Sequence, residues 1–208
     1  SILILSKIKR KRTIAWTHGW YGKETRTRRW LKKAFYSMFD YLLLYNEYAI
    51  QLMVKEGFDR NKMTCIANSL DSDKELQIRQ HLKVTDIYSR HFGNNHPTLI
   101  YCGRLQKRKR LDLLLKAVAR LRDSGTIINV VFVGEEIDDM KLPETIRSFS
   151  LDAQCWLFGP CYDDNTIGEL FYNAHACVSP GNVGLTAIHS LTFGCPVITH
   201  GNLPNQMP

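Results

Sequence analysis

The chain has 208 residues, of which 44% are hydrophobic and 23% are charged. These fractions exclude an intrinsically disordered chain, and the length allows one ordinary domain or two small ones. Lysine and arginine total 28 against 20 aspartate and glutamate residues, a formal net charge of +8. An anionic partner is therefore expected, and nucleic acid, an anionic membrane surface and a phosphorylated substrate all satisfy that charge.

Residues 1–5 are apolar and precede the basic run 7–12. The apolar segment is too short to span a bilayer, and its positive charge follows rather than precedes it, so it is neither a signal peptide nor an anchor. The chain lacks an initiator methionine and ends just after a strand-like run, 196–199. We therefore expect the sequence to be truncated at both ends.

Short β-rich runs then alternate with helical stretches, which predicts parallel sheets flanked by helices. The expected strands are 13–16, 41–45, 63–67, 98–102, 127–133, 154–158, 176–179 and 196–199. The expected helices are 24–39, 47–56, 111–122, 165–173 and 185–193.

The stretch between residues 71 and 97 is polar and shows no strand pattern. We expect a first domain over 1–71, an interdomain linker over 72–96 and a second domain over 97–208. The six cysteines lie singly in apolar runs, which favours a reducing compartment and argues against disulfides or a cysteine-based metal site. The histidines show no ligand spacing, so no metal is assigned.

The strongest motif runs from the strand 98–102 through Gly103 and Arg104 to Lys109 at the start of a helix. Glycine allows a sharp turn, and the two cations approach from the loop and from the first helical turn. This arrangement suits a diphosphate. An exposed basic loop is the alternative interpretation of the same residues.

A second motif follows the strand 176–179, with Gly181, Asn182 and Gly184 in a turn before the helix that starts at Leu185. Free backbone N–H groups near the helix start can hold phosphate oxygens above the carboxyl edge of a sheet. A strand, turn and helix are common in α/β proteins, so this motif is weakly specific by itself.

Together the two motifs resemble the donor domain of retaining glycosyltransferases of family 4, which have the GT-B-type fold. The usual patterns there are Gly-Arg-Leu with a lysine five residues after the arginine, then Pro-Ser-x-x-Glu-Gly-x-Gly-Leu, a helix and Gly-x-Pro-Val. Lesser matches occur in the same order along the chain, and together they cover most of it: 16–19, 68–71, 131–135, 157–159, 169–170 and 174–176.

The resemblance implies an α/β fold with two Rossmann-like domains, of which 1–71 is an incomplete acceptor-side domain and 97–208 a nearly complete nucleotide-sugar domain. Arg104 and Lys109 would neutralise the departing diphosphate, and His18 would contribute to the catalytic centre. No Asp-x-Asp motif occurs, so neither metal nor other cofactor is expected. The donor contacts would come from Gly103, Gly134, Glu135, Gly181, Asn182, Gly184, Leu185, Thr186 and His189.

The sequence departs from the family at a pair of glutamates spaced eight residues apart, because the aligned positions are Gly181 and His189. In the family the first glutamate contacts the transferred sugar and the second holds ribose hydroxyls. His189 retains a ring nitrogen for the ribose, whereas Gly181 has no side chain, so sugar contacts would come from backbone amides or Asn182. Both an active divergent subfamily and an inactive one fit this loss, and the intact phosphate-binding motifs favour the active one.

We therefore expect a cytoplasmic, metal-independent glycosyltransferase of hexosyltransferase type, active in surface polysaccharide biosynthesis. It would move a sugar from a nucleotide-sugar donor to a saccharide or lipid-linked saccharide with retention, although the fragment alone need not turn over. The alternatives are a nucleotide-sugar-binding pseudoenzyme, an epimerase of the same fold and a nucleic-acid-binding module. The last has no recognised motif, and no nucleic-acid partner is expected.

Aromatic and basic residues interleave over residues 20–36. Such a cluster suits peripheral contact with an anionic membrane or with a phosphorylated lipid carrier. A solvated helix with one packed face is the alternative.

Overall fold

The computed structural model describes residues 2–202. Contacts divide the chain into two compact units, and the boundary along the sequence lies between Asn68 and Ser69. Among the described residues, no helix combines the length and apolar character that crossing a bilayer requires.

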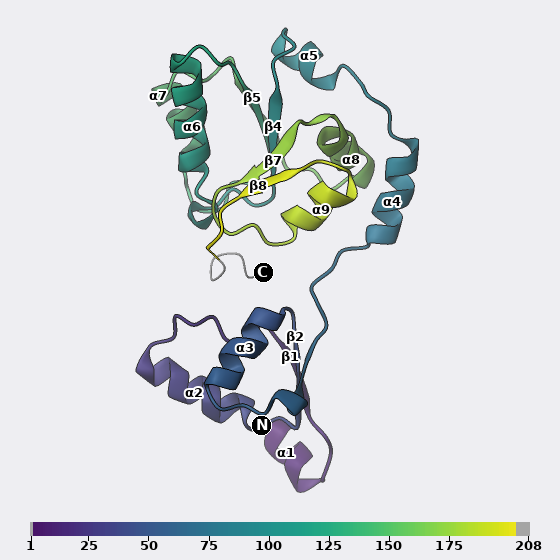
Figure 1. The fold of residues 1–208 in the computed structure, drawn as a ribbon, viewed down its shortest axis with the longest axis vertical. Helices are drawn as coiled ribbons and strands as arrows, with labels where there is room; N and C mark the ends of the chain where they lie inside the picture. Colours follow the sequence, from purple (N-terminus) through teal and green to yellow (C-terminus); the bar gives the residue numbers. More distant parts are fainter. Residues whose placement is uncertain (1, 203–208) are drawn as a thin grey trace. The chain divides into compact units, whose positions relative to one another are not determined.

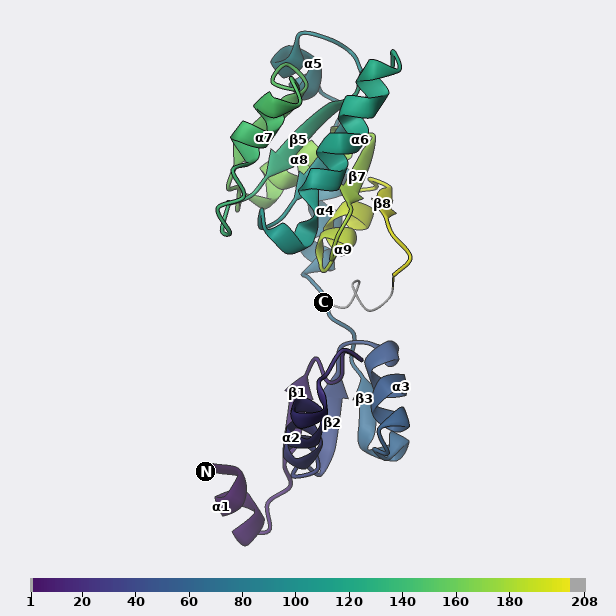
Figure 2. The ribbon, with the colours of Figure 1, turned by 90° about the vertical axis from the view of Figure 1, so that its left-hand side faces the viewer.

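The first unit is built on a parallel sheet whose strands lie side by side in the order β1-β2-β3 (Figure 2). These strands are β1 (Ile14–Thr17), β2 (Tyr41–Leu44) and β3 (Met63–Cys65), the last preceded by the 3-10 turn Arg60–Lys62. The helices are α1 (Ile2–Ile8), α2 (Arg26–Tyr36) and α3 (Glu47–Lys55). Asn46 caps α3 by accepting a hydrogen bond from the N–H of Ala49 at 2.7 Å.

One face of this sheet carries the core of the first unit. Ala15 on β1 is buried together with residues of β2, α2 and α3. Its neighbours Ile14 and Trp16 point to the opposite face, as strand alternation requires, and are 61% and 66% exposed. The two faces of β1 therefore differ sharply in burial.

The second unit holds a five-stranded parallel sheet in the order β6-β5-β4-β7-β8. Its strands are β4 (Thr98–Cys102), β5 (Asn129–Val133), β6 (Cys155–Gly159), β7 (Ala176–Ser179) and β8 (Val197–Thr199). Its helices are α4 (Ser72–His81), α5 (Ile87–Phe92), α6 (Leu111–Asp123), α7 (Leu142–Ser148), α8 (Asp164–Asn173) and α9 (Thr186–Thr192).

Helices cover both faces of the second sheet (Figure 1). Helices α6 and α7 enclose one core with the side chains on one face of β4 and β5, including Tyr101 and Phe132. Helices α5 and α8, together with Phe193 at the end of α9, enclose the other core, in which Ile100 and Phe171 are fully or almost fully buried. Such a doubly covered parallel sheet places every strand's carboxyl end at one common edge.

The segment that the sequence predicts to be a linker, 72–96, instead belongs to the second unit. It forms α4 and α5, and α4 packs on α8 and α9. The guanidinium of Arg79 donates to the carbonyl of Thr192 at 2.9 Å, and the Tyr88 hydroxyl donates to the carbonyl of Leu170. The polar composition of the segment concealed these helices, although Ile78 of α4 and Tyr88 of α5 pack in the apolar core of the second unit. Helices α1 and α7 were likewise outside the predicted elements.

Candidate functional site

The turns after β4 and β5 interlock at the carboxyl edge of the second sheet. Gly103 donates its N–H to the carbonyl of Val133 at 2.9 Å. A Cβ added to Gly134 would lie only 2.1 Å from the carbonyl oxygen of Gly103, and the φ of Gly134 is +145°. Only glycine tolerates both conditions, so the two predicted turn glycines form one tight backbone junction.

A hydrogen bond joins the start of α9 to this junction. The hydroxyl of Thr186 donates to the carbonyl of Cys102 at 2.9 Å. A Cβ on Gly103 would lie 3.3 Å from the same hydroxyl oxygen. Gly103, Gly134 and Thr186, which the sequence assigns to the donor site, are therefore neighbours.

Lys109 brings a buried cation to the turn between β7 and α9. Its side chain reaches this turn from the 3-10 helix Lys107–Lys109, and only 7% of the residue is exposed. Its Nζ donates to the carbonyl of Asn182 at 2.6 Å and lies 3.9 Å from the position of a Cβ on Gly184. Burial, and secondarily the nearby charge of Arg108, lowers the pKa of Lys109 to about 8.

Arg104 and Glu135 lie at the same junction but expose their side chains. The carbonyl of Arg104 accepts from the hydroxyl of Tyr101 at 2.9 Å, and the N–H of Leu105 donates to the carbonyl of Glu135 at 2.8 Å. Among residues 2–202, no hydrogen bond or ion pair holds the Arg104 guanidinium. The backbone of this loop is fixed, whereas the guanidinium remains open to solvent.

Gly181 occupies a position with no room for a side chain. An added Cβ would lie 2.2 Å from the carbonyl oxygen of Arg108 and 2.7 Å from the carbonyl carbon of Lys109. Both neighbours are backbone atoms, so they cannot give way as a flexible side chain does. The position where the family resemblance places a glutamate is thus closed by the segment that carries Lys109.

His189 meets a partner that sequence reasoning missed. Its Nδ1 lies 2.8 Å from Oε1 of Glu75 on α4, and the carboxyl side chain of Glu75 is 6% exposed. Burial raises the pKa of Glu75, an effect that the attraction of His189 opposes. No sequence signal pointed to Glu75, because its segment lacked a strand or helix pattern.

A cavity of about 640 Å³ adjoins the turn between β7 and α9. Neither Arg104 nor Lys109 lines it, so the buried amine of Lys109 faces the turn rather than this cavity. The lining residues are Arg108, Arg110, Leu113, Pro180, Gly181, Asn182, His200 and Asn202.

His18 lies in the first unit, directly after β1. Its ring centroid is 4.6 Å from that of Tyr45 and 6.4 Å from that of Tyr21. Its Nδ1 is buried and has no hydrogen-bond partner among the described residues. The aromatic neighbours hold the ring in place without engaging that nitrogen.

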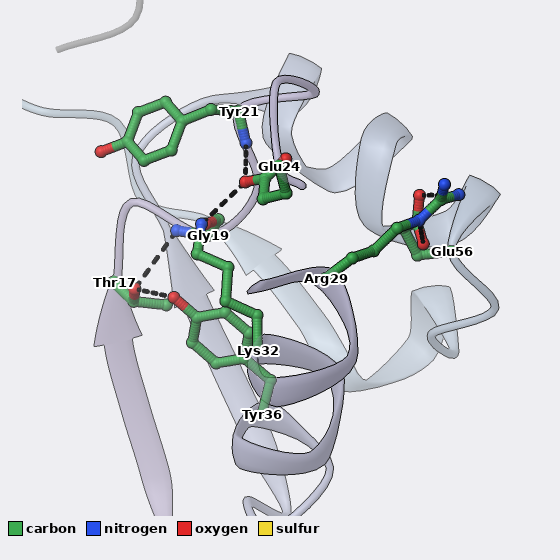
Figure 3. A network of polar contacts seen from close by, with 8 residues as sticks. All are labelled: Thr17, Gly19, Tyr21, Glu24, Arg29, Lys32, Tyr36 and Glu56. Atoms are coloured by element: carbon green, nitrogen blue, oxygen red, sulfur yellow. Dashed lines mark hydrogen bonds and ion pairs between the residues drawn. The ribbon is translucent and has the colours of Figure 1, made fainter. Parts of the chain in front are cut away.

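Polar contacts clamp the loop that carries His18 (Figure 3). Nζ of Lys32 donates to the carbonyl of Gly19 at 3.0 Å and to Oε1 of Glu24 at 2.8 Å. Thr17 accepts from the N–H of Gly19 at 3.2 Å and shares a hydrogen bond of 2.8 Å with the Tyr36 hydroxyl. Burial raises the pKa of Glu24, but the hydrogen bonds from Lys32 and from the loop backbone outweigh it, so the net pKa is lowered.

The described part of the chain contains no cluster of three or more histidine, cysteine, aspartate or glutamate residues placed to hold a metal ion.

Residues 85–205, more than half of the 208 residues, match the family described as glycosyl transferases group 1. The chain belongs to this family.

Individual members resemble parts of the chain. A GDP-mannose-dependent alpha-(1-6)-phosphatidylinositol dimannoside mannosyltransferase of Mycobacterium tuberculosis is 29% identical over 103 residues, covering 48% of this chain and 26% of that protein. A glycogen synthase of Thermus caldophilus is 29% identical over 120 residues, covering 56% of this chain and 26% of that protein. The chain therefore spans about a quarter of the length of these curated relatives.

Solved structures extend the likeness to the fold. Anabaena HepE in complex with UDP matches with a TM-score of 0.72 at 15% identity, over 95% of this chain and 55% of that chain. The galactosyltransferase WaaB of the lipopolysaccharide outer core matches with a TM-score of 0.67 at 14% identity, over 95% of this chain and 52% of that chain. The predicted α/β fold of GT-B type is confirmed.

Proposed function

We propose that this chain is part of a glycosyltransferase whose second unit binds a nucleotide-sugar donor. One observation carries the proposal: the buried amine of Lys109 contacts the turn at Asn182 and Gly184. Helix α9, which follows this turn, is bonded through Thr186 to the end of β4. A cation at the carboxyl edge of a parallel sheet, surrounded by tight glycine turns, is suited to a diphosphate.

The chemistry assigned to these residues is electrostatic. As the bond between the sugar carbon and the phosphate oxygen breaks, negative charge grows on the leaving nucleoside diphosphate. Lys109 and the solvent-exposed guanidinium of Arg104 would stabilise that charge without a metal ion. Transfer is therefore expected to continue in excess EDTA, and full loss with recovery on adding Mg²⁺ would contradict metal independence.

The finer assignments follow the family resemblance. We propose retention of anomeric configuration, as in family 4, and a role in surface polysaccharide biosynthesis in the cytoplasm. The first unit would belong to the acceptor side and bind a saccharide or lipid-linked saccharide, and His18 would contribute to catalysis.

Helix α2 supports contact of the first unit with an anionic membrane surface. Trp30 and Leu31 are 70% and 54% exposed on it, and exposed cations flank them. Apolar side chains beside basic ones suit a membrane interface.

The direct test presents the protein with UDP-glucose, GDP-mannose and other common nucleotide sugars, with saccharide and lipid-linked saccharide acceptors. Released UDP or GDP would be measured by a coupled assay, and donor binding by calorimetry. We expect one donor to bind and to release its nucleoside diphosphate. Neither binding nor release for any donor would refute the proposal.

A nucleotide-sugar-binding pseudoenzyme is the second candidate, and the closed position at Gly181 favours it. A glutamate there would need to displace the backbone of Arg108 and Lys109, so no carboxylate from this position can contact the sugar. Donor binding without transfer to any acceptor would support the pseudoenzyme, whereas efficient transfer would eliminate it.

The pH dependence of UDP and GDP binding tests the role of Lys109. Because the pKa of Lys109 is lowered to about 8, mainly by burial, the amine loses its charge as pH rises through that value. The charged form attracts the diphosphate. The affinity for UDP or GDP is therefore expected to be highest below about pH 8 and to fall up to about tenfold per pH unit above it. Calorimetry on Lys109→Arg, which stays charged, should show no such fall. A flat profile for the wild type between about pH 7 and 10 would contradict this role.

A further inference from the structure

The carboxyl group of Glu75 on α4 is buried beside His189 on α9. Its Oε1 lies 2.8 Å from Nδ1 of His189, and only 6% of the side chain is exposed. Its Oε2 is buried without a hydrogen-bond partner among residues 2–202. Burying a carboxylate is costly unless a partner compensates it, and His189 is the partner that the described structure provides.

The neighbouring cations Lys74 and Arg79 on α4 are engaged elsewhere. Lys74 pairs with Asp164 on α8, and Arg79 donates to the carbonyl of Thr192. The charge of Glu75 is therefore directed at the imidazole of His189. Nδ1 has no other hydrogen-bond partner among the described residues, so Oε1 is the acceptor within reach of it.

The two ring nitrogens of His189 have different surroundings. Nδ1 is buried, whereas 26% of the side chain is exposed. Nε2 is not among the buried unpartnered atoms of the described residues and receives no hydrogen bond there, so the exposed edge of the ring carries it. The ring of Phe171 lies at 11° to the imidazole and supports its orientation.

His189 also shares a side of α9 with Thr186. Residues three apart on a helix are surface neighbours, and Thr186 contacts the end of β4 at Cys102 and Gly103. His189 therefore lies on the side of α9 that faces the glycine junction of the proposed donor site.

We propose that Glu75 is a positioning residue that holds the Nδ1–H tautomer of His189, so that Nε2 accepts a hydrogen bond from a hydroxyl group of the bound nucleotide sugar. This inference rests on the proposed function. A neutral imidazole carries one N–H donor and one acceptor, and a partner at one nitrogen decides which is which. Because the carboxylate only accepts, it assigns the proton to Nδ1 and leaves Nε2 as the acceptor.

A double-mutant cycle tests whether Glu75 acts through His189. Calorimetry would compare UDP and UDP-glucose, and GDP and GDP-mannose, on the wild type, Glu75→Gln, His189→Ala and the double variant. His189→Ala should weaken binding about tenfold, the equivalent of one hydrogen bond. Glu75→Gln should weaken it about threefold to fivefold alone and less than twofold when His189 is absent. Equal effects in both backgrounds would overturn the proposal.

The comparison of UDP with UDP-glucose also shows whether the ribose or the transferred sugar supplies the hydroxyl group. If the ribose supplies it, the variants lose the same factor with UDP as with UDP-glucose. If the transferred sugar supplies it, the loss occurs only with the nucleotide sugars. Asp73→Asn is the matched control, because it removes an exposed charge from the same helix. It should change the affinity neither for the nucleoside diphosphates nor for the nucleotide sugars.

Nitrogen-15 NMR of the ring provides a test without any ligand. When the ring of His189 is neutral, it should carry its proton on Nδ1 in the wild type and lose this preference in Glu75→Gln. A wild-type proton on Nε2 would overturn the inference, even if Glu75→Gln fails to fold. If no nucleotide binds the wild type, the proposed function fails, and the ring tautomer alone decides the role of Glu75.

Discussion

Replacing Lys109 by methionine is expected to reduce sugar transfer by about 100-fold or more, the scale seen when one preorganised donor to a developing anion is removed. The amine is buried on the turn at Asn182, so no neighbouring flexible cation takes its place. Methionine has a similar length and is apolar, so it removes the charge while filling most of the same space. Steady-state kinetics with the best donor of the panel would measure the loss.

Lys107→Met is the matched control, because Lys107 belongs to the same 3-10 helix but is exposed. It should change turnover by less than about twofold, as expected for an exposed charge. Thermal unfolding of both variants would show whether the fold is intact. Equal activities for the two variants, with both folded, would remove Lys109 from the site.

Replacing Gly134 by alanine is expected to destabilise the second unit by at least about 3 kcal/mol, the sum of overpacking and backbone strain. The new Cβ would meet the carbonyl oxygen of Gly103 at 2.1 Å, on a residue whose φ is +145°. Urea unfolding would measure the loss of stability, and amide exchange in β4 and β5 would locate it. Nucleotide binding should fall with it, because the Gly103 turn must move.

Gly125→Ala separates backbone strain from overpacking, the two causes of the expected loss in Gly134→Ala. Gly125 also has a positive φ, of +88°, but a Cβ there would meet no atom within 4 Å. Its replacement should cost only about 1 kcal/mol, from backbone strain alone. If Gly125→Ala and Gly134→Ala cost the same, the close approach of the β4 and β5 turns is not what requires Gly134.

The strand pattern of the second unit could be predicted from the sequence because buried parallel strands are short apolar runs between turn residues. The expected strands 98–102 and 176–179 coincide with β4 and β7, and the expected helix 111–122 differs from α6 by one residue. Helix α4 could not be predicted in the same way, because its apolar and polar residues do not separate onto two faces. Its position depends on contacts with distant segments, which include the bonds of Arg79 and Lys74 to α9 and α8 and the packing of Ile78 on the core.

The sequence by itself determined the alternation of strands and helices and the turn at Gly103, and it indicated Lys109 as a cation for the proposed site. These follow from rules that act over a few residues: side-chain periodicity, the backbone freedom of glycine and the charge of the side chain. Only the tertiary structure decided that Gly181 has no space for a side chain and that Glu75 faces His189. Both facts depend on close approaches between segments far apart in the chain, and the spacing of residues within one segment carries no information about such contacts.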